Sequence, residues 1–303
     1  MIKNMILATM AAGFLATSCS SDDDNNGNTG EANLSLNLEG LERLGNGYVY
    51  EGWVIVNDTP RSTGVFTVNA EGELSQTEFQ VNQELLDNAT RFVLSIEPEG
   101  ETGEAALTPA DTKLLVGDFS DDLATLNTDV VGDFSDATGR FFLRTPTDET
   151  NGNNGNDQYG VWFGVPGMPP TPSLSLPTLP AGWVYEGWVI GESGPLSTGT
   201  FADFNTPDDN ADNDQLVSFS GTAQAGPNIP GEDFFMNAPE GEMFPLDVRG
   251  RTVVVSVEPV PDDSPAPFVL KPLLGPAGLE VQPISYTLNQ NLGTFPSGSV
   301  TRK

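Results

Sequence analysis

The feature that most constrains the fold is an internal repeat at an offset of 135 residues. Residues 47–66 return as residues 182–201, and thirteen of these twenty positions are identical. The shared pattern is V-Y-E-G-W-V-I, followed after a short loop by S-T-G-x-F. Identity of this extent does not arise by chance, so the chain carries two copies of one module.

Other segments of each copy predict short strands. Residues 92–98 correspond to residues 253–259, and residues 113–117 correspond to residues 271–275. Within 92–98 the apolar side chains alternate with less apolar ones, as is typical of a half-buried strand. The 33 glycines and 24 prolines favour short strands joined by many turns over long helices. We therefore predict an all-β fold of two tandem β-sandwich-like modules.

The repeat also predicts the domain boundaries. Copy one is expected over residues 34–172 and copy two over residues 173–303. Residues 140–145 and 159–165 predict a hairpin added to copy one, and the proline-rich segment 166–180 predicts the connector between the copies. The offset grows from 135 to 161, so copy two has about 26 additional residues, which fall in the loop-like stretch 203–250.

The sequence of the first hairpin of each copy also predicts how its two strands pair. Pairing Ile55 with Ser62 places Trp53 opposite Gly64, where the glycine opens space for the large ring. We expect the tryptophans to be core residues, with ligand stacking as the alternative. The predicted packing residues of the two copies are Tyr50, Trp53, Gly64, Phe66, Tyr185, Trp188, Gly199 and Phe201.

Each hairpin also carries a glutamate, which is disfavoured in strands. Glu51 and Glu186 either face water or accept hydrogen bonds from neighbouring Ser and Thr hydroxyls. We favour the second interpretation, which is a structural role.

The N-terminus predicts export and lipidation. Lys3 precedes an apolar run of eleven residues, 5–15, so residues 1–18 are expected to be a cleaved signal peptide. The sequence L-A-T-S-C at 15–19 resembles a bacterial lipobox, which implies lipidation of Cys19, the sole cysteine. Several acyl chains on one residue form a stable membrane anchor. The alternative is an ordinary signal peptide with an incidental cysteine.

An acidic, flexible tether is predicted over residues 19–33. It resembles the export signal that follows the lipidated cysteine in surface lipoproteins of Bacteroidetes, which implies the outer membrane and the cell surface. The periplasmic face is the alternative. The formal net charge of -31 repels phosphate backbones, so no nucleic-acid partner is expected.

The repeated motif resembles the C-terminal, extracytoplasmic domain of anti-sigma-K factors. That domain combines a Tyr-x-x-Trp hairpin, a Pro and Ser/Thr-Gly return and a later Glu-Pro strand, which correspond here to residues 50–66 and 95–98, and in copy two to 185–201 and 256–259. The resemblance implies the fold. The zinc-holding, sigma-binding part of those regulators has no counterpart here, because the sequence has no histidine, only Cys19, and no internal apolar run of ~18 residues. We therefore expect no cytosolic sigma factor as a partner.

Most catalytic chemistry is excluded by composition. Without histidine, a Ser-His-Asp triad, a Cys-His pair and a common zinc site cannot form. Paired carboxylates stay open, because there are 43 acidic residues. Asp208, Asp212 and Asp214 alternate in the manner of Ca²⁺ ligands, although we favour a solvated loop. No cofactor is predicted.

These observations predict a non-catalytic, outer-membrane lipoprotein. Its body is expected to bind an extracellular or envelope protein or glycan, or to contribute to envelope structure. One alternative is a periplasmic accessory regulator that acts through a true anti-sigma factor. The other is a carboxylate-dependent hydrolase, which a clustered pair of carboxylates with raised pKa in a cleft would favour.

Overall fold

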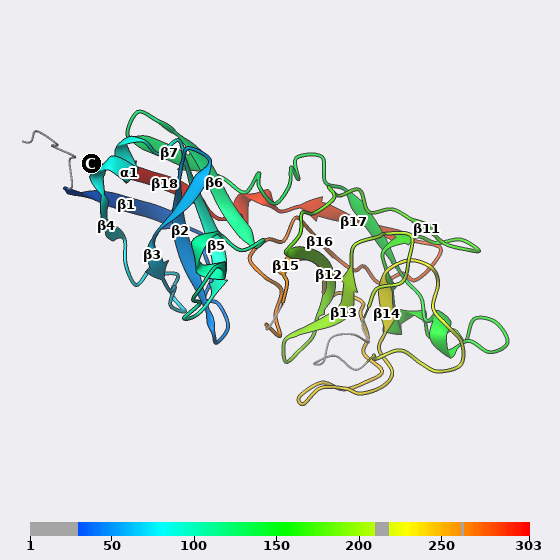
Figure 1. Ribbon diagram of the computed structural model, residues 1–303. Coiled ribbons are helices and arrows are strands. Elements are labelled where there is room, and N and C mark those ends of the chain that lie inside the picture. Colours follow the sequence, from blue (N-terminus) through cyan, green and yellow to red (C-terminus); the bar gives the residue numbers. More distant parts are fainter. Residues whose placement is uncertain (1–29, 210–217, 262–263) are drawn as a thin grey trace, which may run out of the picture.

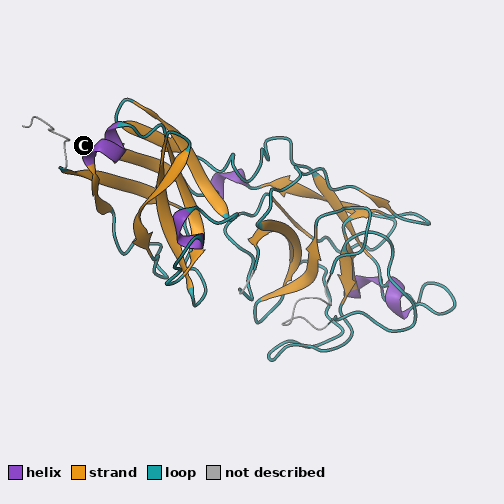
Figure 2. Cartoon of the chain, in the orientation of Figure 1, coloured by secondary structure: helices purple, strands orange, loops and turns teal. Residues whose placement is uncertain are grey.

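The computed structural model describes residues 30–209, 218–261 and 264–303, and their regular structure is nearly all β (Figure 2). The prediction of an all-β fold in two sandwich-like modules is confirmed. The strands form two eight-stranded antiparallel sheets and one small hairpin, in two bodies along an elongated molecule (Figure 1). The predicted signal peptide, Cys19 and most of the predicted tether lie outside the described residues.

The first module is one curled sheet. Its strands are β1 (Glu31–Glu39), β2 (Tyr48–Val56), β3 (Thr59–Phe66), β4 (Glu78–Asn82), β5 (Arg91–Pro98), β6 (Lys113–Ser120), β7 (Leu123–Leu126) and β18 (Ser297–Arg302). They are arranged in the order β3-β2-β5-β6-β7-β18-β1-β4. The two edge strands, β3 and β4, contact each other, so the sheet closes around an apolar core. The short helix α1 (Gln83–Asp87) follows β4.

The second module repeats this arrangement. Its strands are β8 (Gly139–Leu143), β9 (Gly160–Trp162), β12 (Trp183–Ile190), β13 (Pro195–Phe201), β14 (Gly231–Asp233), β15 (Thr252–Pro259), β16 (Leu273–Pro276) and β17 (Ser285–Gln290). Their order is β13-β12-β15-β16-β17-β8-β9-β14, and the edge strands β13 and β14 again contact each other. β14 lies within the stretch 203–250 that was expected to be a loop, and it occupies the position of β4.

The two modules exchange one strand. β18 comes at the end of the second module in sequence, yet it lies between β7 and β1 of the first. β8 follows β7 in sequence, yet it lies between β17 and β9 of the second. Their registers correspond, because Gly298 of β18 lies opposite Leu126 and Gly139 of β8 lies opposite Leu288. Each module is therefore closed by the strand that follows the other module.

The exchange changes the domain boundaries. The predicted hairpin of residues 140–145 and 159–165 exists as β8 and β9, but it belongs to the second sheet. Segment 166–180 runs within the second module, where β10 (Gly164–Val165) pairs with β11 (Thr171–Pro172). The division at 172/173 is therefore wrong. The chain passes between the modules through the segments 127–138 and 291–296, which follow equivalent strands of the repeat.

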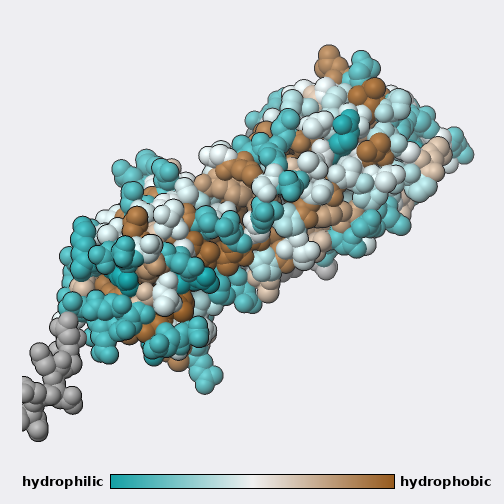
Figure 3. Space-filling view, turned by 90° about the horizontal axis from the view of Figure 1, so that it is seen from above, coloured by the Kyte–Doolittle hydropathy of each residue, from teal (hydrophilic) through white to brown (hydrophobic). Residues whose placement is uncertain are grey.

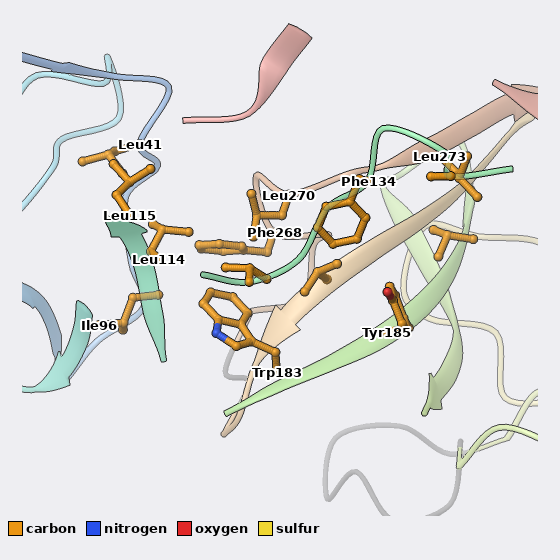
Figure 4. Close-up of a cluster of buried hydrophobic side chains, with 14 of the residues drawn as sticks. Leu41, Ile96, Leu114, Leu115, Phe134, Trp183, Tyr185, Phe268, Leu270 and Leu273 are labelled. Atoms are coloured by element: carbon orange, nitrogen blue, oxygen red, sulfur yellow. The ribbon is translucent and has the colours of Figure 1, made fainter. Parts of the chain in front are cut away.

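These two crossover segments pack against each other. The rings of Phe134 and Phe295, one from each segment, meet edge to face at 5.6 Å between centroids. The Gln290 amide donates to the carbonyl of Ser135 at 2.6 Å. Figure 4 shows Leu114 of the first module near Phe268 of the second, and the two cores form one continuous cluster. On the face seen in Figure 3, hydrophobic residues gather around the middle of the molecule.

The register predicted for the first hairpin is also wrong. Trp53 pairs with Ser62, Gly52 pairs with Gly64, and a β-bulge separates Gly52 from Trp53. The cause is a tight two-residue turn at 57–58 with both residues in the left-handed region, which brings the strands into register earlier than expected. The second copy has the same bulge and pairs. The space at Gly64 serves another ring, since the atoms nearest to a Cβ on Gly64 belong to Phe79.

Candidate functional site

The repeated tyrosine and phenylalanine lie in the core of each module. Tyr50 stacks on Phe66 with centroids 5.6 Å apart, and Tyr185 stacks on Phe201 at 6.0 Å. Gly64 and Gly199 both have positive φ. A Cβ on Gly64 would lie 2.9 Å from the ring of Phe79. These residues pack inside the curled sheets.

The repeated tryptophans are buried on the opposite, outer face of the sheet. Trp53 is 1% exposed and Trp188 is 2% exposed, but neither belongs to the main core cluster. Trp53 pairs with Val93 on β5, whereas the core residue Val54 pairs with Phe92. Both faces of β5 are therefore buried, which corrects the prediction of a half-buried strand. The alternation seen in the sequence reflected an apolar inner face and a more polar outer face.

The outer face of each module carries the same hydrogen-bonded chain, which we call the Trp–Ser–Glu chain. In the first module Trp53 Nε1 donates to Ser95 Oγ at 2.9 Å, Ser95 donates to Glu97, and the Ala110 amide donates to Glu97 at 2.8 Å. The equivalent members in the second module are Trp188, Ser256, Glu258 and the Phe268 amide. The loop after β5 or β15 is thus tied to the chain through its glutamate.

The glutamate of each hairpin lies beside this chain. Glu51 accepts a hydrogen bond from Ser62, and Glu186 accepts one from Ser197. Both therefore have the hydroxyl partner that a structural role requires. Their surroundings differ, because Glu186 is fully buried whereas Glu51 is half-buried.

Glu51 lines a cavity of about 420 Å³ on the first module. The other principal lining residues are Val49, Val65, Pro98, Glu99 and Glu101. Val49, Val65 and Pro98 form apolar walls, and the three glutamates supply negative charge. None of the residues that line this cavity is a lysine or an arginine.

Two carboxylates on this face of the sheet have raised pKa values: Glu51, which lines the cavity, and Glu97, which is buried beside it and does not line it. Burial raises the pKa of Glu51, the hydrogen bond from Ser62 opposes this shift, and Glu101 adds to it. Burial also raises the pKa of Glu97, against the hydrogen bonds from Ser95 and Ala110. Glu97 Oε2 has no hydrogen-bond partner among the described residues. A cationic group with an aliphatic stem would match both the charge and the apolar walls.

The arrangement does not favour a carboxylate-dependent hydrolase. Glu51 and Glu97 share one face and both have raised pKa values. However, Glu97 is 1% exposed, whereas hydrolysis by two carboxylates requires both groups at the substrate. The equivalent pair in the second module, Glu186 and Glu258, is fully buried.

A further buried acid, Asp233 on β14, was not found from the sequence. It accepts hydrogen bonds from Trp162 Nε1 at 2.9 Å and from the amide and hydroxyl of Thr147 at 2.8 and 2.6 Å. Burial raises the pKa of Asp233 to about 7, opposed by these hydrogen bonds and assisted by Glu232. The equivalence of β14 with β4, which places Asp233 on a strand, is visible only in the strand order of the folded modules.

Of the three candidate Ca²⁺ ligands, for which we favoured a solvated loop, only Asp208 lies within the described residues. Asp208 is partly buried and accepts a hydrogen bond from the Gly231 amide at 2.7 Å. Burial raises its pKa well above the ordinary value. Asp212 and Asp214 lie outside the described residues. Within the described ranges, no group of three or more His, Cys, Asp or Glu residues is placed to hold a metal ion, and no helix has the length and apolarity to cross a membrane.

The family model described as "Anti-sigma-K factor rskA, C-terminal" matches residues 10–112. The match includes β1 to β5 of the first module and thus the hairpin that carries Trp53 and Glu51. No curated protein and no solved structure matches the chain. The resemblance to the anti-sigma-K C-terminal domain is therefore confirmed for the first copy. For the second copy it stays a prediction based on the repeat.

Proposed function

We propose that the protein is a non-catalytic binding protein, anchored to the outer membrane through lipid on Cys19 and displayed on the cell surface. Its first module takes a cationic group of an extracellular or envelope protein or glycan into the Glu51 cavity. The observation that carries this proposal is the contrast between Glu51, which is open to a cavity, and its sealed counterpart Glu186.

The chemistry of the cavity supports a lysine, an arginine or an amine as the bound group. Val49 and Val65 would contact the aliphatic stem, while Glu51 would accept a charge-assisted hydrogen bond from its head. The net charge of -31 would also attract a basic partner over longer distances and speed its association.

The binding proposal is tested by titrating the unlipidated protein with pentalysine at low salt, followed by calorimetry. We expect Glu51→Gln to weaken binding about tenfold, which corresponds to ~1.4 kcal/mol. Glu78→Gln is the matched control, because Glu78 also accepts from a serine on the first module, Ser35, but does not line the cavity. Equal losses in both variants, or no binding at all, would exclude the cavity as the site.

Lipid anchorage rests on the lipobox-like residues 15–19. We expect Cys19→Ala to remove the protein from the membrane fraction, because the acyl chains are lost. A mutant that still partitions into the detergent phase would contradict the anchor.

The family match favours a second candidate, an accessory regulator that contacts the like domain of a true anti-sigma factor. This role requires the periplasmic face. Protease digestion of intact cells separates the two candidates: surface display predicts cleavage of the protein, whereas the periplasmic role predicts protection until the outer membrane is opened.

A further inference from the structure

The exchanged strand determines how a pulling force crosses the first module. β1 and β18 are antiparallel, with Leu34 opposite Arg302 at one end and Glu39 opposite Ser297 at the other. The start of β1, which the predicted tether precedes, thus lies beside the end of β18. Both crossover segments leave the module at the opposite end, since Gly298 lies opposite Leu126 (Figure 1).

This geometry loads the strand pair in shear. A force that holds β1 at its first residue and pulls on the second module draws β1 and β18 past each other. Hydrogen bonds between antiparallel strands are perpendicular to the strands, so sliding strains the whole ladder at once. A force applied to neighbouring strand ends would instead peel the hydrogen bonds apart one after another.

Without the exchange, the load would peel the strands. β8 is the equivalent of β18, and it runs on directly from β7 in sequence. If β8 closed the first module, the chain would leave at the end of β8, beside the start of β1. The exchange therefore converts a peeling geometry into a shearing one.

The end of the exchanged strand is also held by its last arginine. The Arg302 guanidinium donates to the carbonyls of Ala89 at 2.9 Å and Asp121 at 2.7 Å, and to that of Leu86. It also lies 4.6 Å from the ring centroid of Phe119. Beyond it, the Lys303 amide donates to the Asn33 carbonyl at 2.9 Å, which ties the end of β18 to β1.

We propose that the protein is a force-bearing tether, in which the first module resists tension between the membrane anchor and the membrane-distal second module. The proposal rests on the proposed function in one respect, which is that the load enters through Cys19. The resistance itself follows from the strand order and does not depend on the lipid.

Single-molecule force spectroscopy of unlipidated residues 19–303 tests the proposal, with the Cys19 thiol as one handle. The second handle is placed by Met168→Cys on an exposed side chain of the second module, or by Lys303→Cys beside β1. We expect the first module to open at a higher force with the handle at 168, which shears β1 against β18, than with the handle at 303, which peels them. Equal or lower force at 168, or unfolding of the second module below the peeling force, would overturn the proposal.

A pair of arginine variants tests whether Arg302 holds the end of β18. Arg302→Ala should lower the opening force in the shearing geometry. Arg249→Ala is the control, because Arg249 pairs with Asp247 on the surface of the second module and should leave that force unchanged. An unchanged opening force in Arg302→Ala would show that Arg302 does not contribute to the mechanical resistance. Failure of these measurements is distinct from failure of the anchor, which membrane fractionation reports.

Discussion

The outer faces of the two modules carry the same residues in different surroundings. Each has a tryptophan, a serine and a glutamate in one hydrogen-bonded chain, with a second glutamate beside it. In the second module both glutamates are fully buried, whereas in the first module Glu51 opens to a cavity. The Trp–Ser–Glu chain is also present in the second module, where its members are buried. Its common role in the two modules is therefore to stabilise the outer face. The candidate site differs from its counterpart because a ligand can reach Glu51, and not because the residues differ.

The largest effect expected is on the tryptophans themselves. Trp53→Ala and Trp188→Ala should each lower the free energy of unfolding of their module by about 3–5 kcal/mol, as truncations of large buried side chains do. Denaturant unfolding of the two variants checks this. Near-unchanged stability for Trp53→Ala alone would break the equivalence of the modules and assign Trp53 to ligand contact.

The next effect is a pH dependence of stability that is expected for the second module. The pKa of Asp233 is raised in the folded protein, so the folded state holds a proton that the unfolded state has released. The stabilisation is full below about pH 4 and is lost as the pH rises towards 7, by on the order of 2–4 kcal/mol. Asp233→Asn should flatten this dependence for the second module in melts between pH 4 and 8. If Asp233→Asn leaves the pH dependence of the second module unchanged, that dependence belongs to another buried acid of the module, such as Asp208.

A smaller effect is expected from the serines of the Trp–Ser–Glu chain. Ser95→Ala and Ser256→Ala each remove the acceptor of the indole N–H and one of the hydrogen bonds that the glutamate accepts, at a cost of about 1–3 kcal/mol. Ser256→Ala should cost at least as much, because its outer face is sealed whereas water can approach near Glu51. Thermal melts of the two variants compare these losses of stability. A clearly larger loss for Ser95→Ala would contradict the interpretation that the outer face of the second module is the more fully buried one.

The sequence predicts the strands well, because their signal is local. The repeat and the alternation around residues 92–98 placed β5, and the glutamate of each hairpin was correctly expected to accept a serine hydroxyl. The predicted register was wrong because the two-residue turn at 57–58, with both residues in the left-handed region, was not expected. The β-bulge between Gly52 and Trp53 then brings Gly64 opposite Gly52. Glu51 was singled out, but part of its cavity is lined by residues of the loop after β5, such as Glu99 and Glu101, and the corresponding loop of the second copy has a different sequence.

The strand exchange could not be predicted for a different reason. β8 and β18 are equivalent in the repeat, and each offers a glycine opposite a leucine, Gly139 with Leu288 and Gly298 with Leu126. By this pairing alone, β8 and β18 are each compatible with either sheet. The exchange is accompanied by contacts between the two crossover segments, such as Phe134 on Phe295, and a contact between residues so far apart in sequence leaves no local pattern.

The strand exchange is tested most directly by disulfide trapping. The sequence beyond Cys19 has no cysteine, so pairs can be introduced into residues 20–303 without competition from another thiol. Thr125 lies opposite Ser299 across β7 and β18, within the range of backbone separations that a disulfide bridges. Thr125→Cys with Ser299→Cys should form a disulfide under mild oxidation, seen as a mass loss and a joined peptide. Thr125→Cys with Arg140→Cys should stay reduced, and a disulfide in that second pair instead of the first would show that β8 closes the first module and that no exchange occurs.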